Sequence, residues 1–85
     1  MREVFELRDK VTFITGAGSG IGRAIATVFA NAGAKVCIAD IDRKKAEEAV
    51  EAIKKAGGEA ISLVGDVSKA ADVEQMVNEA VARYG

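Results

Sequence analysis

The chain has 85 residues, of which 49% are hydrophobic and 29% are charged, and its formal net charge is -1. This length allows one small domain that buries about 60% of the surface of its unfolded chain. The composition is that of a folded globular protein rather than a disordered one. A net charge so close to zero gives no support for binding to nucleic acid or to an anionic membrane. We therefore treat residues 1–85 as a single domain and expect neither partner.

The N-terminal residues and the cysteine content favour a cytoplasmic protein. Residues 1–10 alternate charged and apolar side chains without the apolar core of a signal peptide, and no apolar run approaches the length of a membrane span. Cys37 is the single cysteine and the chain has no histidine. We therefore expect no disulfide within the chain and no metal site of the Cys/His type. Cys37 lies inside an apolar run and is interpreted as a small core residue.

Short apolar runs alternate along the chain with amphipathic segments. Residues 11–15, 35–39 and 60–64 are short apolar or β-branched runs with little polar alternation, which is typical of strands covered on both faces. The segments between and after them carry apolar residues three and four positions apart, which indicates helices. The pattern predicts a three-layer α/β fold, a Rossmann-like half with the element order βαβαβα. Its parallel sheet has the order 3-2-1, and the first two helices lie on the same face.

The ends of the three helices are predicted from their capping residues. The first helix begins near Ile21 and stops at Gly33, because glycine favours the left-handed conformation that follows a helix. The second helix runs from a cap at Asp42 to Ala56. Ser68 is expected to cap the third helix, since a serine hydroxyl can accept a hydrogen bond from a free N–H of the first turn.

A glycine-rich segment separates the first predicted strand from the first helix. Residues 15–22 read Thr-Gly-Ala-Gly-Ser-Gly-Ile-Gly, and the N-terminus of a helix at this point favours a bound phosphate. The spacing is T-G-x-x-x-G-x-G, which is neither G-x-G-x-x-G nor a P-loop. Through Thr15, Gly16, Gly20 and Gly22 it resembles the glycine motif of the short-chain dehydrogenase/reductase family. The alternative is a glycine-rich turn without a ligand.

Asp40 lies at the end of the second predicted strand, 18 residues after the last glycine of the motif. A Rossmann unit places an acid here to accept hydrogen bonds from the adenosine ribose, and this carboxylate repels a 2′-phosphate. In the resembled family a basic residue before the second motif glycine or after this strand accompanies NADP, and this chain has Ser19 and Ile41 there. NAD is therefore favoured and NADP is less favoured. Arg43 and Lys44 are interpreted as exposed helix residues. The alternative for Asp40 is a purely structural role in its loop.

Asp66 and Val67 follow the third predicted strand and resemble the acid-hydrophobic pair that holds the adenine ring in the same family. Asp66 could also orient the turn into the last helix through hydrogen bonds of its own side chain, and the two roles are compatible. The cofactor-binding residues implied by the resemblance are Gly16, Ser19, Gly20, Ile21, Gly22, Asp40, Ile41, Asp66 and Val67.

The resemblance covers the chain from about residue 10 but only the N-terminal part of a typical family member. The family's catalytic Tyr-x-x-x-Lys pair, its upstream serine and its Asn-Asn-Ala-Gly segment are not present. Tyr84 is followed only by Gly85 and is interpreted as a packing residue, so no catalytic residue is assigned. Two hypotheses follow. The chain is either the NAD-binding segment of an enzyme that transfers hydride to or from an alcohol or ketone when whole, or a stand-alone dinucleotide-binding or structural module without activity.

The predicted sheet also leads us to expect a homodimer. In the resembled fold the strand at residues 11–15 is central, whereas this chain leaves one of its edges free. A free apolar edge recruits other strands, and the last helix alone cannot cover its face of the sheet. We expect two copies to pair through this strand or to exchange their last helices.

Overall fold

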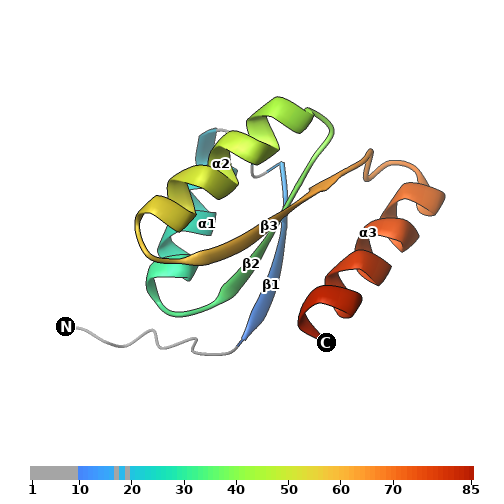
Figure 1. Ribbon diagram of the computed structural model, residues 1–85. Helices are drawn as coiled ribbons and strands as arrows, with labels where there is room; N and C mark the ends of the chain where they lie inside the picture. The colour runs from blue at the N-terminus through green and yellow to red at the C-terminus, as the bar shows by residue number, and fades with distance from the viewer. Residues whose placement is uncertain (1–9, 17, 19) are drawn as a thin grey trace.

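The computed structural model describes residues 10–16, 18 and 20–85. The parallel strands β1 (Val11–Thr15), β2 (Lys35–Asp40) and β3 (Glu59–Val64) form one sheet in the order β1-β2-β3. Helices α1 (Gly20–Asn31) and α2 (Arg43–Lys55) lie on one face of this sheet, and α3 (Ala70–Tyr84) lies on the other (Figure 1). The three layers and the strand order confirm the predicted Rossmann-like half.

The face of the sheet under α1 and α2 carries the larger part of the core. Val36 and Ile38 of the central strand β2 point to this side and are fully buried. Against them pack Ala26 and Ala30, the buried residues of α1. Because these side chains are small, α1 can lie close to the sheet. The buried face of α2 is the predicted one, with Ala46, Ala49, Val50 and Ile53.

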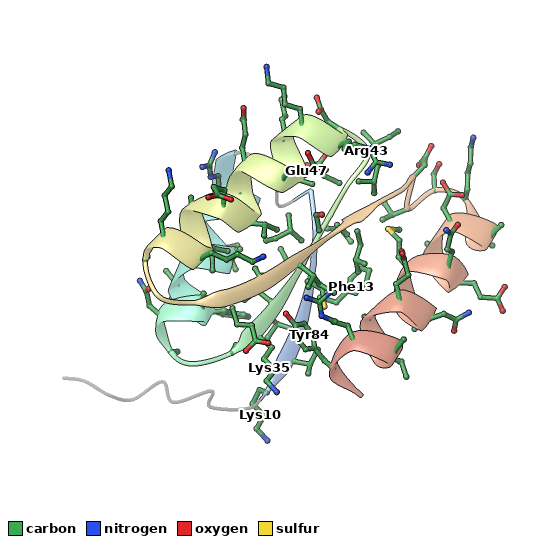
Figure 2. The ribbon with its side chains drawn as sticks, viewed as in Figure 1. Lys10, Phe13, Lys35, Arg43, Glu47 and Tyr84 are labelled. Atoms are coloured by element: carbon green, nitrogen blue, oxygen red, sulfur yellow. The ribbon has the colours of Figure 1, made fainter. Side chains whose placement is uncertain are left out.

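The opposite face is covered by α3. Cys37 of β2 and Leu63 of β3 pack against Met76 of α3, and all three side chains are buried. Cys37 is therefore a core residue, as predicted, and burial raises the pKa of its thiol. Tyr84 packs at the end of this cluster as predicted, and the ammonium of Lys35 lies 5.7 Å from the centre of its ring (Figure 2).

The capping predictions differ in outcome for α2 and α3. Asp42 caps α2 as predicted, because its Oδ1 accepts a hydrogen bond of 3.1 Å from the N–H of Lys45. The prediction that Ser68 caps α3 is wrong: the cap position is Lys69, and no side chain makes the capping bond there. The N–H and Oγ of Ser68 instead donate to Oδ1 of Asp66, at 2.9 and 2.6 Å. A local turn thus competes successfully for this hydroxyl.

Strand β1 forms an edge of the sheet, and its surroundings are apolar and exposed. On the side of α3, Val11 and Phe13 are 46% and 37% exposed, because α3 packs over β2 and β3. On the other side, the apolar stripe of α1 formed by Ile21, Ile25 and Val28 is also exposed. Most of the apolar residues whose spacing predicted α1 therefore lie outside the contact with the sheet. Phe29 is the exception, because it packs against the core beside the buried alanines of α1.

Candidate functional site

The carboxyl ends of the three parallel strands meet at one edge of the sheet. Backbone hydrogen bonds continue past the strands there, because the N–H of Gly16 donates to the carbonyl of Ala39 at 2.8 Å and the N–H of Gly65 donates to the carbonyl of Asp40 at 3.1 Å. These ends surround a hollow of about 200 Å³. Its lining includes five of the residues predicted from the sequence, and the full set is Gly16, Ala39, Asp40, Ile41, Gly65, Asp66 and Val67.

The glycine segment joins this hollow to the start of α1. Gly16 and Gly20 have φ angles of 64° and 63°, in the left-handed region that glycine adopts without strain. Gly20, Ile21 and Gly22 form the first turn of α1, which carries no acidic side chain. Because the first N–H groups of a helix have no partner within the helix, this end of α1 favours an anion. Ser19, also predicted from the sequence, lies outside the described residues.

Asp40 is half-buried and both of its carboxylate oxygens accept hydrogen bonds. Oδ2 accepts the N–H of Gly18 at 2.9 Å, and Oδ1 accepts the N–H of Asp42 at 3.0 Å. Gly18 is a residue that sequence reasoning did not select. A Cβ on Gly18 would lie 2.5 Å from Oδ2 of Asp40 and 2.9 Å from Cβ of Lys45. The sequence indicated this contact only through the extra glycine inside the motif. The need for glycine there follows from the Asp40 carboxylate, which is distant in the sequence.

Asp66 is held in a turn between β3 and α3. Its carboxylate accepts two hydrogen bonds from Ser68, and these bonds lower the pKa of Asp66 below its ordinary value. Its N–H donates to Oδ2 of Asp72 at 2.9 Å. The structural role left open for Asp66 is therefore present. Asp66 and the exposed Val67 also border the hollow, so their predicted contact with adenine stays a prediction.

The basic residues that follow Asp40 lie on the outer face of α2. Arg43 is 71% exposed, and its Nη1 lies 3.9 Å from Oε2 of Glu47 one helical turn later (Figure 2). Lys44 is exposed as well. Both positions agree with the expected solvent-facing surface of α2.

Other chemistry is limited within the described part of the chain. Residues 10–16, 18 and 20–85 contain no helix that is long and apolar enough to cross a membrane. The same residues hold no group of three or more His, Cys, Asp or Glu side chains able to bind a metal ion. Burial, followed by the charges of Glu59 and Cys37, raises the pKa of Tyr84, and its buried hydroxyl has no hydrogen-bond partner among the described residues.

The sequence profile of a family described as short chain dehydrogenase matches residues 10–85. The chain belongs to this family. It is 54% identical over 78 residues to an uncharacterized oxidoreductase of Thermotoga maritima, and the match covers 92% of this chain and 30% of that protein. The short-chain dehydrogenase/reductase homolog YusS of Bacillus subtilis is 41% identical over 78 residues, which are 91% of this chain and 72% of YusS. The family resemblance predicted from the glycine motif is thereby confirmed.

The structure also matches members of the short-chain dehydrogenase family. It superposes on the hydroxysteroid dehydrogenase of Escherichia coli with a TM-score of 0.93 at 36% identity, covering 95% of this chain and 34% of that enzyme. With the glucose dehydrogenase of Caenorhabditis elegans the TM-score is 0.87 at 35% identity, covering 93% of this chain and 35% of that enzyme. The chain thus spans about a third of the length of these solved structures.

Proposed function

We propose that this chain is the NAD-binding part of a short-chain dehydrogenase that oxidises an alcohol or reduces a ketone. One observation carries the proposal: the hollow at the carboxyl ends of the strands is lined by Gly16 of the glycine segment, by Asp40 and Ile41, and by Asp66 and Val67. Ligands of open parallel α/β sheets bind at such an edge. The same residues are those that the family resemblance implies for a dinucleotide.

The residues around the hollow suit the adenosine and pyrophosphate of a dinucleotide. The N–H groups of the first turn of α1 attract the pyrophosphate. Each oxygen of Asp40 already accepts one backbone N–H and keeps further acceptor capacity for a ribose hydroxyl. Ile41 and Val67 are 68% and 51% exposed, and both line the hollow, so they offer apolar surface to the adenine ring. Gly16 adds no side chain, which leaves the approach to the backbone open.

A preference for NAD over NADP follows from the charge at Asp40. A carboxylate beside the ribose repels a 2′-phosphate. Arg43 has a carboxylate partner on its own helix in Glu47. NADP is therefore the less favoured cofactor.

The nicotinamide ring supplies hydride transfer when the cofactor is bound. The residues of this chain hold the adenosine and pyrophosphate end, and we assign no catalytic residue among them. A stand-alone binding module without activity is the alternative. Both hypotheses expect the 85-residue chain alone to bind cofactor without turnover, so the assay for reduced cofactor with simple alcohols is made on an active short-chain dehydrogenase in which this chain replaces the matching segment. Turnover of that hybrid supports the dehydrogenase, and binding without turnover supports the stand-alone module.

Calorimetric titration with NAD and NADP at fixed ionic strength tests the proposal. We expect NAD to bind with a dissociation constant on the order of micromolar to millimolar, as suits a partial site, and NADP to bind more weakly. Asp40→Ala should reduce the difference between the two cofactors. Asp42→Asn is the matched control, because it removes the same charge from a residue outside the hollow, keeps the oxygen that caps α2, and should leave a clear preference. Equal affinities in the unmodified chain would contradict the ribose role of Asp40.

We propose further that two copies of the 85-residue chain associate through β1. The support is the free edge of this strand within the described residues, together with exposed Val11 and Phe13 on one side and the stripe of α1 on the other. Pairing of the two β1 edges would bury all three features, and exchange of α3 is the alternative geometry. Light scattering should give twice the mass of the chain at tens of micromolar, roughly the range of moderate interface affinities. Phe13→Lys should restore the monomer, and a well-folded monomer of the unmodified chain would contradict the pairing.

A cytoplasmic location also stays a proposal. It rests on the buried free thiol of Cys37, the single cysteine of the chain, which suits a reducing compartment. Cell fractionation with an antibody against the chain is the test.

A further inference from the structure

Asp40 makes hydrogen bonds to three separate loops at the edge of the sheet. Its Oδ2 holds the N–H of Gly18 in the glycine segment, and its Oδ1 holds the N–H of Asp42 at the start of α2. Its main-chain carbonyl accepts the N–H of Gly65 beyond β3. One residue therefore ties together the three segments that surround the hollow.

The contact between Asp40 and Gly18 is close enough to fix the position of the glycine segment. Gly18 is buried although it lies in a surface turn. The space where its side chain would be is filled by Oδ2 of Asp40 and by Cβ of Lys45 in the first turn of α2. A hydrogen bond from an N–H to a charged acceptor is stronger than one between neutral groups. The middle of the segment is thus anchored to the end of β2, 22 residues away.

We infer that Asp40 is a positioning residue for the glycine segment, in addition to being the proposed acceptor for the ribose hydroxyls. The inference deepens the proposed function, because the segment that Asp40 anchors leads into the first turn of α1, where the pyrophosphate is proposed to bind. If Asp40 only bound the ribose, its loss would weaken only those ligands that carry ribose hydroxyls. The bond from the Gly18 N–H to Oδ2 of Asp40 lies within the chain itself, so loss of the carboxylate should weaken even a ligand that has no ribose hydroxyls.

The first test uses amide NMR signals of the ligand-free chain. An N–H that donates to a carboxylate resonates downfield and exchanges slowly with solvent. In Asp40→Ala the Gly18 amide should move upfield and exchange at least about tenfold faster, the change expected from loss of one hydrogen bond to a charged acceptor. Asp40→Asn should give an intermediate result, because its side chain keeps one acceptor oxygen. The Gly65 amide is the internal control, since its acceptor is the main-chain carbonyl that both variants retain.

The second test compares ADP with 2′,3′-dideoxy-ADP, which carries the same pyrophosphate but no ribose hydroxyls. Binding of both is measured by calorimetry to the unmodified chain, to Asp40→Ala and to Asp42→Asn. We expect Asp40→Ala to weaken the dideoxy ligand by about tenfold and ADP by more, because one anchoring bond and then the ribose bonds are lost. Asp42→Asn removes an equal charge but keeps the oxygen that caps α2, so it should not weaken the dideoxy ligand, which separates anchoring from simple electrostatics.

The outcomes distinguish this inference from the proposed function. An unchanged Gly18 amide in Asp40→Ala overturns the positioning role, whatever the ligands do. Equal affinity of the dideoxy ligand for the unmodified chain and Asp40→Ala also overturns it, while leaving ribose recognition intact. If ADP fails to bind the unmodified chain, the proposed function fails, and the Gly18 amide still decides whether Asp40 positions the segment.

Discussion

A Cβ atom on Gly18 would lie 2.5 Å from Oδ2 of Asp40, so only glycine fits between the glycine segment and this carboxylate. Lys45 closes the other side, with its Cβ at 2.9 Å. Gly18→Ala should therefore force the segment away from β2 and lower the free energy of unfolding by about 1–3 kcal/mol, as overpacking does elsewhere. Urea unfolding followed by circular dichroism measures this loss.

The double variant Gly18→Ala with Asp40→Ala separates the two contacts of Gly18. Removing the carboxylate takes away the nearer obstacle, so the added methyl group should destabilise this background less than the unmodified chain. An equal loss in both backgrounds would mean that Lys45, rather than Asp40, excludes a side chain at position 18.

Two isoleucines in helices test which surfaces stabilise the fold. Ile53 of α2 is 2% exposed, whereas Ile21 of α1 is 80% exposed. Ile53→Ala should lower the free energy of unfolding by about 2–5 kcal/mol, because it leaves a cavity in the core. In the Phe13→Lys background, which is expected to be monomeric, Ile21→Ala should change it by no more than about 0.5 kcal/mol, since its side chain is exposed there and alanine also favours the helix. Both are measured by urea unfolding, and a large loss at Ile21 would mean that the stripe of α1 is covered in solution.

Hydrogen bonds from Ser68 hold the pKa of Asp66 below its ordinary value of 3.8. A carboxyl with a lowered folded pKa stabilises the folded state at higher pH, and this contribution disappears as the pH falls through the folded pKa. Ser68→Ala removes the Oγ donor but keeps the N–H donor, so the pKa of Asp66 should rise part of the way. Titration of its side-chain carboxyl carbon by NMR measures the shift, and Ser62→Ala on β3 is the control. An unchanged pKa in Ser68→Ala would exclude the hydroxyl as its cause.

Cys37 should react slowly with thiol reagents in the folded chain. Its side chain is fully buried, and burial raises the pKa of the thiol, so both access and thiolate content are reduced. Reaction with a chromogenic disulfide at pH 8 should be at least about 100-fold slower than in urea, because exposure requires opening of the core. A fast reaction without denaturant would contradict the packing of α3 on β2.

The sequence predicts most of the fold because its signals are local. The uninterrupted apolar run of β2 and the apolar face of α2 specify a covered strand and an amphipathic helix directly. Helix α1 is different, because apolar residues occupy most of its surface. Spacing alone could not tell that Ala26 and Ala30, rather than Ile21 and Ile25, pack on the sheet.

The site is less readable than the fold, since its contacts join distant parts of the chain. The motif and Asp40 could be selected from type and spacing, and the strand ends bring Asp40 together with Asp66 in one hollow. The bond between Gly18 and Asp40 spans 22 residues and depends on how two loops meet. Local signals can also be ambiguous, as Ser68 shows. Its hydroxyl could cap α3 or bond to Asp66 in the turn before it, and the sequence did not indicate which of the two would form.

The most direct test of the proposed binding site is an amide NMR titration of the chain with NAD. We expect the amide signals of Gly16, Asp40, Ile41, Asp66 and Val67 to shift together as NAD is added, because these residues line the hollow at the carboxyl ends of the strands. A second hollow between β3 and α3, lined by Ile61, Ser62, Leu63, Glu79, Ala82 and Arg83, provides the comparison and should not respond. Shifts confined to that second hollow, or no shifts at millimolar NAD, roughly the weakest binding expected of a partial site, would contradict the proposed site.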